Sequence, residues 1–229
     1  SEMCIRDRLK CISILAMSII TQSIFAENSV VLDVGHSPKQ AGSTAANGYP
    51  EYTYNLSMVN SIEYFLKSRH VQVLRSSVNE DKVSVVQRAT RYPNANLFIS
   101  VHHDSIPTEL TKYKNQLKGF SIFVSKKNPE YGKSLKCANL IGQNLKSIGE
   151  SPSTYHGMNI PGENKKLLTS NGVYQYDNLV VLKKSQKPAV LIEIGVIANP
   201  EEANRLSNQK VIWKISENIA QSIQQCLNQ

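Results

Sequence analysis

The sequence predicts an α/β domain with a largely buried sheet, and two observations carry this prediction. Short apolar runs alternate along the chain with longer segments in which apolar residues recur at the spacing of a helix. The chain is also long enough to enclose a core, since it has 229 residues, of which 41% are hydrophobic. At this length a single domain is the expectation.

Three of the predicted strands lie in the first half of the chain. Residues 29–34 form an apolar run that Gly35 ends, and a loop with Ser, Pro and Gly follows at 35–50. Further strands are predicted at 71–76 and 97–103, and the second of these ends in two histidines.

Two helices are predicted between these strands. Residues 52–69 carry an apolar stripe, which favours an amphipathic helix. A second helix begins at Val83 and ends near Pro93, because the residue before a proline is disfavoured in a helix. The stripe of the first helix consists of Leu56, Val59, Ile62, Phe65 and Leu66.

The second half of the chain adds strands and helices by the same criteria. Gly149 fits the C-cap of a long helix, and a proline with acidic residues after Asn199 favours a helix start. Residues 150–178 are polar with weak periodicity, so no element is predicted there. The predicted strands are at 118–125 and 189–197, and the predicted helices are at 128–149, 199–208 and 209–226.

The N-terminal residues 1–26 are typical of a secretory signal peptide. A basic segment at 6–10 precedes a short apolar stretch at 11–26 that ends in the small residue Ala26. The stretch is short and polar for a membrane span, so we expect cleavage and export without stable membrane insertion. The destination is the periplasm, or the extracellular space if the host lacks an outer membrane, and an uncleaved anchor is the alternative. Residues 1–8 start without methionine and are interpreted as a fragment edge.

Two cysteines lie beyond the signal peptide, Cys137 and Cys226. Each falls in a helical pattern. They either pair in an oxidising compartment or remain buried free thiols. Neither has the spacing of a metal site.

The net charge of +8 favours an anionic partner such as nucleic acid, a membrane surface or an acidic polymer. Nucleic acid is the weaker choice, because the sequence contains no arginine-rich run and no basic patch interleaved with aromatic residues. Solubility alone explains the surplus equally well.

Polar side chains gather at the ends of the predicted apolar strands. Ligands bind beyond the carboxyl ends of strands in open α/β sheets, and burying carboxylates and imidazoles there is costly unless they pair or bind metal. Two imidazoles and a carboxylate are typical of catalytic zinc, and a further carboxylate can serve as general base. A single histidine at a strand end is as often a hydrogen-bonded loop residue as a metal ligand. The residues concerned are His36, Glu51, His102, His103, Asp104 and Glu193.

Three motifs carry a resemblance to a known family. D-x-G-H at 33–36, S-x-H-x-D at 100–104 and E-x-G at 193–195, with Glu51 between the first two, are similar to those of the zinc-dependent N-acetylmuramoyl-L-alanine amidases. Each motif alone is weak, but their combination is specific. The resemblance covers residues 29–226.

The resemblance implies both a fold and a reaction. The fold is a three-layer α/β/α sandwich around a mostly parallel, mixed sheet of about six strands, forming a catalytic domain at 27–229. The reaction is hydrolysis of the amide between N-acetylmuramic acid and L-alanine in peptidoglycan, for wall remodelling or daughter-cell separation. Carried over by position, His36, Glu51 and His102 bind one Zn²⁺. Glu193 activates the zinc-bound water and then protonates the leaving amine.

Five neighbouring residues each have two alternative assignments. His103 points to the face opposite His102 if the strand alternates, so it either supports the ligands or faces substrate. Asp33 and Asp104 either orient the ligand histidines or are ordinary turn or surface carboxylates. Arg88 supports the site or forms a surface salt bridge. His156 contacts substrate or is merely exposed, and exposure is favoured.

Two departures from the family pattern stand out. Val34 and Ser37 replace the proline and glycine common around the first histidine, and Val196 replaces an aromatic residue after the E-x-G motif. None of these changes removes a proposed ligand, so activity is expected. Val196 is expected to alter the shape of the substrate pocket.

Other functions remain open from the sequence. One alternative is a non-catalytic peptidoglycan-binding module, which the presence of Glu193 argues against. The other is a different exported zinc amidohydrolase or peptidase, because the ligand set does not define which amide is cut. We expect a monomer whose partner is peptidoglycan, with an activator protein as a further possible partner. Residues 150–178 are hypothesised to be a lid or inhibitory element.

Overall fold

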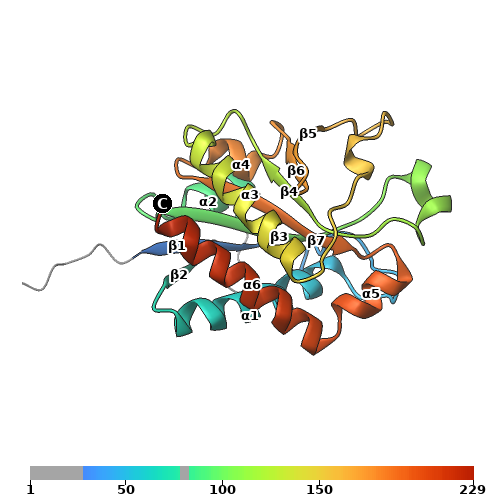
Figure 1. Ribbon diagram of the computed structural model, residues 1–229, viewed down its shortest axis with the longest axis horizontal. Coiled ribbons are helices and arrows are strands. Elements are labelled where there is room, and N and C mark those ends of the chain that lie inside the picture. Colours follow the sequence, from blue (N-terminus) through green and yellow to red (C-terminus); the bar gives the residue numbers. More distant parts are fainter. Residues whose placement is uncertain (1–27, 78–82) are drawn as a thin grey trace, which may run out of the picture.

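The computed structural model describes residues 28–77 and 83–229, so the predicted signal peptide lies outside the described residues. Within these ranges, seven strands form one sheet with the order β2-β1-β3-β7-β4-β6-β5 (Figure 1). No helix in this part of the chain is long and apolar enough to cross a membrane. The strands are β1 (Ser29–Val34), β2 (Gln72–Arg75), β3 (Leu97–Asp104), β4 (Ser121–Val124), β5 (Lys166–Thr169), β6 (Val173–Gln175) and β7 (Ala189–Val196).

Helices cover both faces of the sheet, which makes it the middle of three layers (Figure 1). Helices α1, α3 and α6 pack on one face, and the short α2 and α4 pack on the other. The predicted α/β sandwich is therefore confirmed. The helices are α1 (Glu51–Ser68), α2 (Val85–Thr90), α3 (Tyr131–Ser147), α4 (Val180–Lys184), α5 (Pro200–Leu206) and α6 (Gln209–Leu227), with 3-10 turns η1 (Thr108–Tyr113) and η2 (Tyr155–Gly157).

The sheet is mixed and mostly parallel, as expected. Strands β2, β1, β3 and β7 run parallel to one another. Strand β4 joins antiparallel to β7 and parallel to β6, and β5 closes the edge antiparallel to β6. Because β1, β3 and β7 are neighbours with one direction, their carboxyl ends open at the same edge of the sheet.

The seven strands agree with the expected sheet of about six, but the two in the polar segment 150–178, β5 and β6, were not predicted. These strands have 4 and 3 residues, too short to show a periodicity, and β5 lies exposed at the sheet edge. The hypothesis that this segment acts as a lid or inhibitory element stays a prediction, and part of the segment belongs to the sheet. Helix α4 and the two 3-10 turns were not predicted, and α3 begins at Tyr131 rather than at residue 128.

A disulfide between Cys137 and Cys226 joins α3 to α6 on one face of the sheet. The two Cα atoms are 5.3 Å apart, and the bond links positions 89 residues apart in the chain. The sequence left open whether these cysteines pair or remain free thiols, and the structure shows that they pair. Both cysteines belong to the larger apolar cluster, which holds α1, α3 and α6 against the sheet.

Candidate active site

The carboxyl ends of β1 and β3 bring two histidines together. Val34 pairs with Val101 in the parallel ladder, and the next residue, Gly35, donates its N–H to the Val101 carbonyl at 2.9 Å. His36 follows with a φ of 68°, in the left-handed region. Its ring lies edge-on to that of His102, with centroids 5.1 Å apart.

Glu51, the first residue of α1, lies between the two imidazoles. Its Oε2 is 3.1 Å from His36 Nε2, and its Oε1 is 3.2 Å from His102 Nδ1. The Ser43 backbone and hydroxyl both donate to Oε2 at 3.2 Å, and the Asn55 amide donates to Oε1 at 3.2 Å. Burial acts to raise the pKa of Glu51, but the contacts with the two histidines outweigh it and hold the pKa well below its usual range.

These three side chains have the geometry of a metal centre. One ligand atom from each of His36, Glu51 and His102 lies within 4.8 Å of the other two. Two imidazoles with one carboxylate suit catalytic zinc, which keeps a fourth position for water or substrate. The Glu51 side chain is buried, whereas that of His36 is 34% exposed, so the cluster opens to solvent on the histidine side. The residues present therefore fit a zinc ion.

Two glycines leave space for this cluster. A Cβ on Gly35 would lie 2.6 Å from the His102 ring. A Cβ on Gly42, whose φ is 76°, would lie 2.5 Å from Glu51 Oε2 and 2.7 Å from the His36 ring. Each position therefore excludes a side chain for steric reasons, and Gly42 also needs the left-handed backbone that glycine adopts freely.

Glu193 lies in β7 beside His102 of β3. Its Oε2 is buried and has no hydrogen-bond partner among the described residues. Burial, with the negative charges of Asp104 and Glu51, raises the pKa of Glu193 well above its usual value. A carboxyl in this environment is suited to accept and release a proton closer to neutral pH.

Arg88 supports the loop that carries His36. Its Nε and Nη2 each lie 2.7 Å from the fully buried Asp33 carboxylate, and Nη2 donates to the Val34 carbonyl at 2.5 Å. Arg88 Nη1 also donates to the His36 carbonyl at 3.5 Å. The alternative that Arg88 forms only a surface salt bridge is therefore wrong, because its partner Asp33 is fully buried. Asp33 acts on the backbone of His36 through Arg88, and the Ser100 hydroxyl donates to it at 2.6 Å.

His103 points away from the cluster, as strand alternation predicts. It is 1% exposed, and its Nδ1 lies 2.8 Å from Asn55 Oδ1. Burial lowers the pKa of His103 to about 3, so the ring is neutral. The substrate-facing alternative is wrong, because the side chain is enclosed between the sheet and α1.

His156 overturns two expectations. It is 4% exposed rather than on the surface, and its ring nitrogens lie 2.6 Å from Asp104 and 2.8 Å from Glu163. Burial alone would lower the pKa of His156, but the two carboxylates outweigh it and raise the pKa. The expectation that Asp104 orients a ligand histidine is also wrong, because its histidine partner is His156. Lys165 lies 2.5 Å from Glu163 and completes the cluster.

Clefts lie on both sides of these groups. A cleft of about 950 Å³ is lined by His36, His102 and Arg88, among other residues. A smaller one of about 330 Å³ is lined by Glu193 and by the His156 cluster. Leu179 is among the residues that line both clefts. Residues of the segment 150–178 thus form a wall of the smaller cleft.

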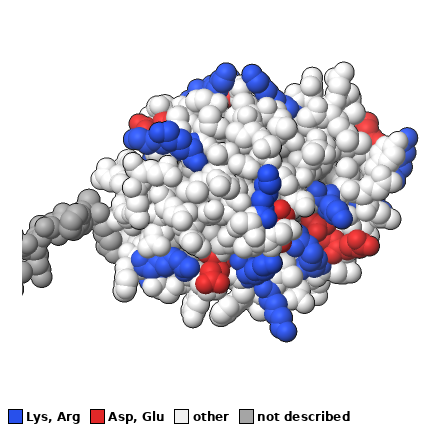
Figure 2. Space-filling model, viewed as in Figure 1, with Lys and Arg blue, Asp and Glu red and all other residues white. Residues whose placement is uncertain are grey.

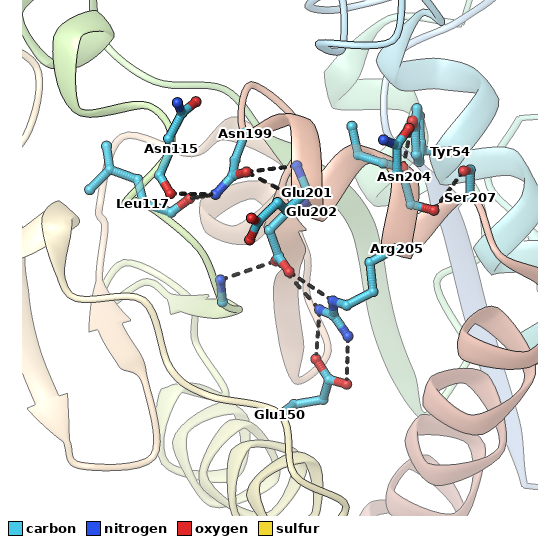
Figure 3. Close-up of polar contacts among 12 residues, drawn as sticks. Tyr54, Asn115, Leu117, Glu150, Asn199, Glu201, Glu202, Asn204, Arg205 and Ser207 are labelled. Carbon is cyan, nitrogen blue, oxygen red and sulfur yellow. Dashed lines mark hydrogen bonds and ion pairs between the residues drawn. The ribbon is translucent and has the colours of Figure 1, made fainter.

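A polar network behind β7 was not predicted (Figure 3). The buried Glu202 of α5 accepts from the Gly119 N–H at 3.2 Å and from Arg205 Nε at 2.7 Å. Arg205 makes two further bonds of 2.9 Å to Glu150. Asn199 caps α5 and donates to the carbonyls of the chain before β4. The network ties the turn after β7 to the start of β4, and no periodic signal in the sequence marks it.

The face of the molecule that carries α1, α3 and α6 shows no single basic patch in its described part. Figure 2 shows Lys and Arg side chains spread over this face and interspersed with Asp and Glu. The net positive charge is therefore not concentrated here into a surface typical of nucleic-acid binding.

The chain is similar to known proteins along most of its length. The family described as N-acetylmuramoyl-L-alanine amidase matches residues 30–225. A probable cell wall amidase LytH of Staphylococcus epidermidis is 26% identical over 183 residues, covering 79% of this chain and 52% of the relative. A probable N-acetylmuramoyl-L-alanine amidase AmiB of Haemophilus influenzae is 26% identical over 234 residues, covering 88% and 53%.

Solved structures agree at the level of the fold. The N-acetylmuramyl-L-alanine amidase Ami1 of Mycobacterium smegmatis superposes with a TM-score of 0.72 at 21% identity, covering 87% of this chain and 96% of that one. The chain spans about half the length of the two curated relatives named above. The family match extends over nearly all the described residues, and so the chain belongs to the N-acetylmuramoyl-L-alanine amidase family.

Proposed function

We propose that this protein hydrolyses the amide between N-acetylmuramic acid and L-alanine in peptidoglycan, with one Zn²⁺ per chain. The observation that carries the proposal is the cluster of His36, Glu51 and His102 at the open edge of the sheet, next to the buried carboxyl of Glu193. The ligand set does not define the amide that is cut. Family membership and the names of the relatives support the muramoyl–alanine bond.

The protein side chains divide the work between holding the metal and moving the proton. His36, Glu51 and His102 would hold zinc, with Glu51 kept ionised by its contacts. When bound, zinc supplies a Lewis acid that lowers the pKa of a water ligand to about 7 and polarises the scissile carbonyl. Glu193 accepts the proton of the attacking water and passes it to the nitrogen of the leaving L-alanine. Hydrolysis therefore ends with a lactyl carboxylate on the sugar and a free amino terminus on the peptide.

The environment of Glu193 fits this role. A base must accept a proton from water and then release it to an amine, which is most efficient when its pKa lies near the working pH. Burial and the neighbouring carboxylates raise the pKa of Glu193 in that direction. The clefts on both sides leave room for a polymeric substrate to extend away from the scissile bond.

We propose that the protein acts outside the cytoplasm, in the periplasm or the extracellular space, in wall remodelling or daughter-cell separation. The signal-peptide pattern supports export, and the Cys137–Cys226 disulfide is typical of an oxidising compartment. Residues 27–229 would form the catalytic domain, active as a monomer on peptidoglycan. An activator protein is a further proposed partner.

The direct test is digestion of purified peptidoglycan by the purified protein, followed by labelling of new amino termini. We expect zinc-dependent release of stem peptides that begin with L-alanine. The Glu193→Gln variant should bind zinc stoichiometrically and release stem peptides far more slowly than the parent. Cleavage that exposes a different amino terminus would identify another zinc hydrolase, and cleavage unaffected by metal removal would contradict the zinc proposal.

A further inference from the structure

We infer that His103 and Asn55 form a positioning pair that sets the affinity of the site for its metal, an inference that rests on the proposed zinc function. Asn55 Nδ2 donates to Glu51 Oε1 at 3.2 Å and to the carbonyl of Gly35 at 3.1 Å. Gly35 directly precedes His36. One side-chain amide therefore holds a metal ligand directly and the backbone of a second one.

A hydrogen-bond count fixes the roles of both side chains. The two N–H groups of the Asn55 amide are used by Glu51 and Gly35, so its Oδ1 can only accept. The group that contacts Oδ1 is Nδ1 of His103, at 2.8 Å. His103 must therefore carry a proton on Nδ1. Its Nε2 is buried without a hydrogen-bond partner among the described residues, as expected of the unprotonated nitrogen of a neutral ring.

The N–H of His103 adds to the two acceptors, Glu51 and Gly35, in holding the Asn55 amide in one orientation. In the reversed orientation Oδ1 would face the Glu51 carboxylate and the Gly35 carbonyl, and three acceptors would meet without a donor. An unpartnered buried nitrogen is unfavourable, yet the chain places one at His103. The favourable counterpart is the hydrogen bond from Nδ1 to Asn55.

Strand β3 thus contributes to the site from both of its faces. His102 contacts Glu51 directly on one face, and His103 acts on Glu51 through Asn55 from the other. Neither Asn55 nor His103 lines the clefts described above, and each is at most 1% exposed. Both are therefore positioning residues, and substrate would not touch them.

The test compares two substitutions of His103 by the zinc dissociation constant, measured by competition with a chelator. His103→Leu fills much of the space but has no donor, and we expect its dissociation constant to rise by about 10- to 100-fold, the usual effect of losing a partner of a metal ligand. His103→Asn places an amide N–H close to the position of Nδ1, so its dissociation constant should stay within a few-fold of the parent's. Equal losses in both variants would show a packing role and overturn the inference.

Two further measurements separate positioning from simple structural damage. In the metal-free state His103→Leu loses the unpartnered nitrogen but leaves the buried Oδ1 of Asn55 without a donor, so we expect a modest drop in melting temperature with unfolding still cooperative, which His103→Asn should largely recover. Asn55→Leu should weaken zinc binding as well, and the double variant should lose little more than Asn55→Leu alone, since His103 acts through Asn55. Additive losses in the double variant would contradict the inference.

A metal-free observation distinguishes this inference from the proposed function. Nitrogen-15 NMR of the metal-free protein should show His103 protonated on Nδ1, and protonation on Nε2 would overturn the hydrogen-bond assignment. If the parent shows the Nδ1 form but binds no zinc, the proposed function fails, and the effect on metal affinity fails with it. If the parent binds zinc and both His103 variants bind it equally well, the positioning inference alone fails.

Discussion

Glu193 of β7 and His102 of β3 occupy one rung of the parallel ladder, so the proposed base and a proposed metal ligand project from adjacent strands at the same level. Both strands lie inside the sheet, with β1 beyond β3 and β4 beyond β7. The position of Glu193 relative to His102 is therefore set by backbone pairing rather than by a loop. This arrangement agrees with the general requirement that catalytic groups be held in place before substrate binds.

The first prediction concerns Glu193→Gln, which keeps the shape of the side chain and removes its ability to accept a proton. We expect the turnover number on peptidoglycan to fall by about 10²- to 10⁴-fold, the usual contribution of a positioned base. Zinc content should be unchanged, because Glu193 is not among the three clustered ligands. Turnover within about 10-fold of the parent would assign the base to another residue.

The second prediction concerns Gly42→Ala. The added methyl would stand 2.5 Å from Glu51 Oε2 at a φ of 76°, so either the carboxylate or the backbone must move. We expect a loss of about 1–2 kcal/mol in the free energy of unfolding from the unfavourable backbone alone, together with weaker zinc binding. Gly48→Ala is the matched control, because its φ is 87° but a Cβ there meets nothing within 4 Å. It should lose stability without losing zinc affinity, and equal zinc losses in both would refute the steric argument.

The third prediction concerns the buried pair of Arg88 and Asp33. Arg88→Ala would leave a fully buried carboxylate without its cation, which typically costs about 3–5 kcal/mol. Arg88→Lys keeps the charge but loses the two parallel hydrogen bonds, so its loss should be smaller. Chemical denaturation measures the free energy of unfolding of both variants. If Arg88→Ala costs less than about 1 kcal/mol, the pair behaves as a surface salt bridge, contrary to its burial.

The parts of the molecule that sequence predicts well are those that local pattern determines. The apolar runs of β1, β3 and β7 are visible in the sequence; β1 and β3 lead to histidines at or just beyond their ends, and β7 carries Glu193 within the strand. His36, His102 and Glu51 were expected to meet, and they do. The amide of Asn55 was overlooked, although it lies four residues after Glu51 on a predicted helix, a spacing that places two side chains on one face.

The parts that the sequence does not predict depend on contacts between distant segments. Strands β5 and β6 gain their hydrogen bonds from β4 and from each other, and neither is long enough to show alternation. His156 is buried because it meets Asp104, 52 residues away. Such pairings depend on the tertiary fold, so propensity and periodicity contain little information about them.

The fourth prediction concerns the disulfide. Removing it by Cys137→Ser with Cys226→Ser opens a loop closed over 89 residues, and loop entropy predicts a loss of about 4 kcal/mol in the free energy of unfolding. Zinc affinity should be unchanged, because the bond joins α3 to α6 and involves none of the clustered ligands. Denaturation in the presence and absence of a reductant gives the same comparison for the parent. A double variant as stable as the oxidised parent would show that the bond contributes nothing to stability.

The last prediction concerns the pH dependence of stability that His156 produces. Its two carboxylate partners raise the pKa of His156 in the folded state above the usual histidine value of about 6.5. Below 6.5 the folded and unfolded states both hold the proton, and the stabilisation is fully present. As pH rises from 6.5 through the raised pKa, the unfolded state loses the proton first, and the free energy of unfolding falls by at most about 1.4 kcal/mol per pH unit.

His156→Gln, which cannot be protonated, should remove this decline. Chemical denaturation of the parent and the variant at pH values below and above about 6.5 measures how the gap in stability between them changes. If the gap between them does not narrow as pH rises, His156 is not protonated in the folded protein.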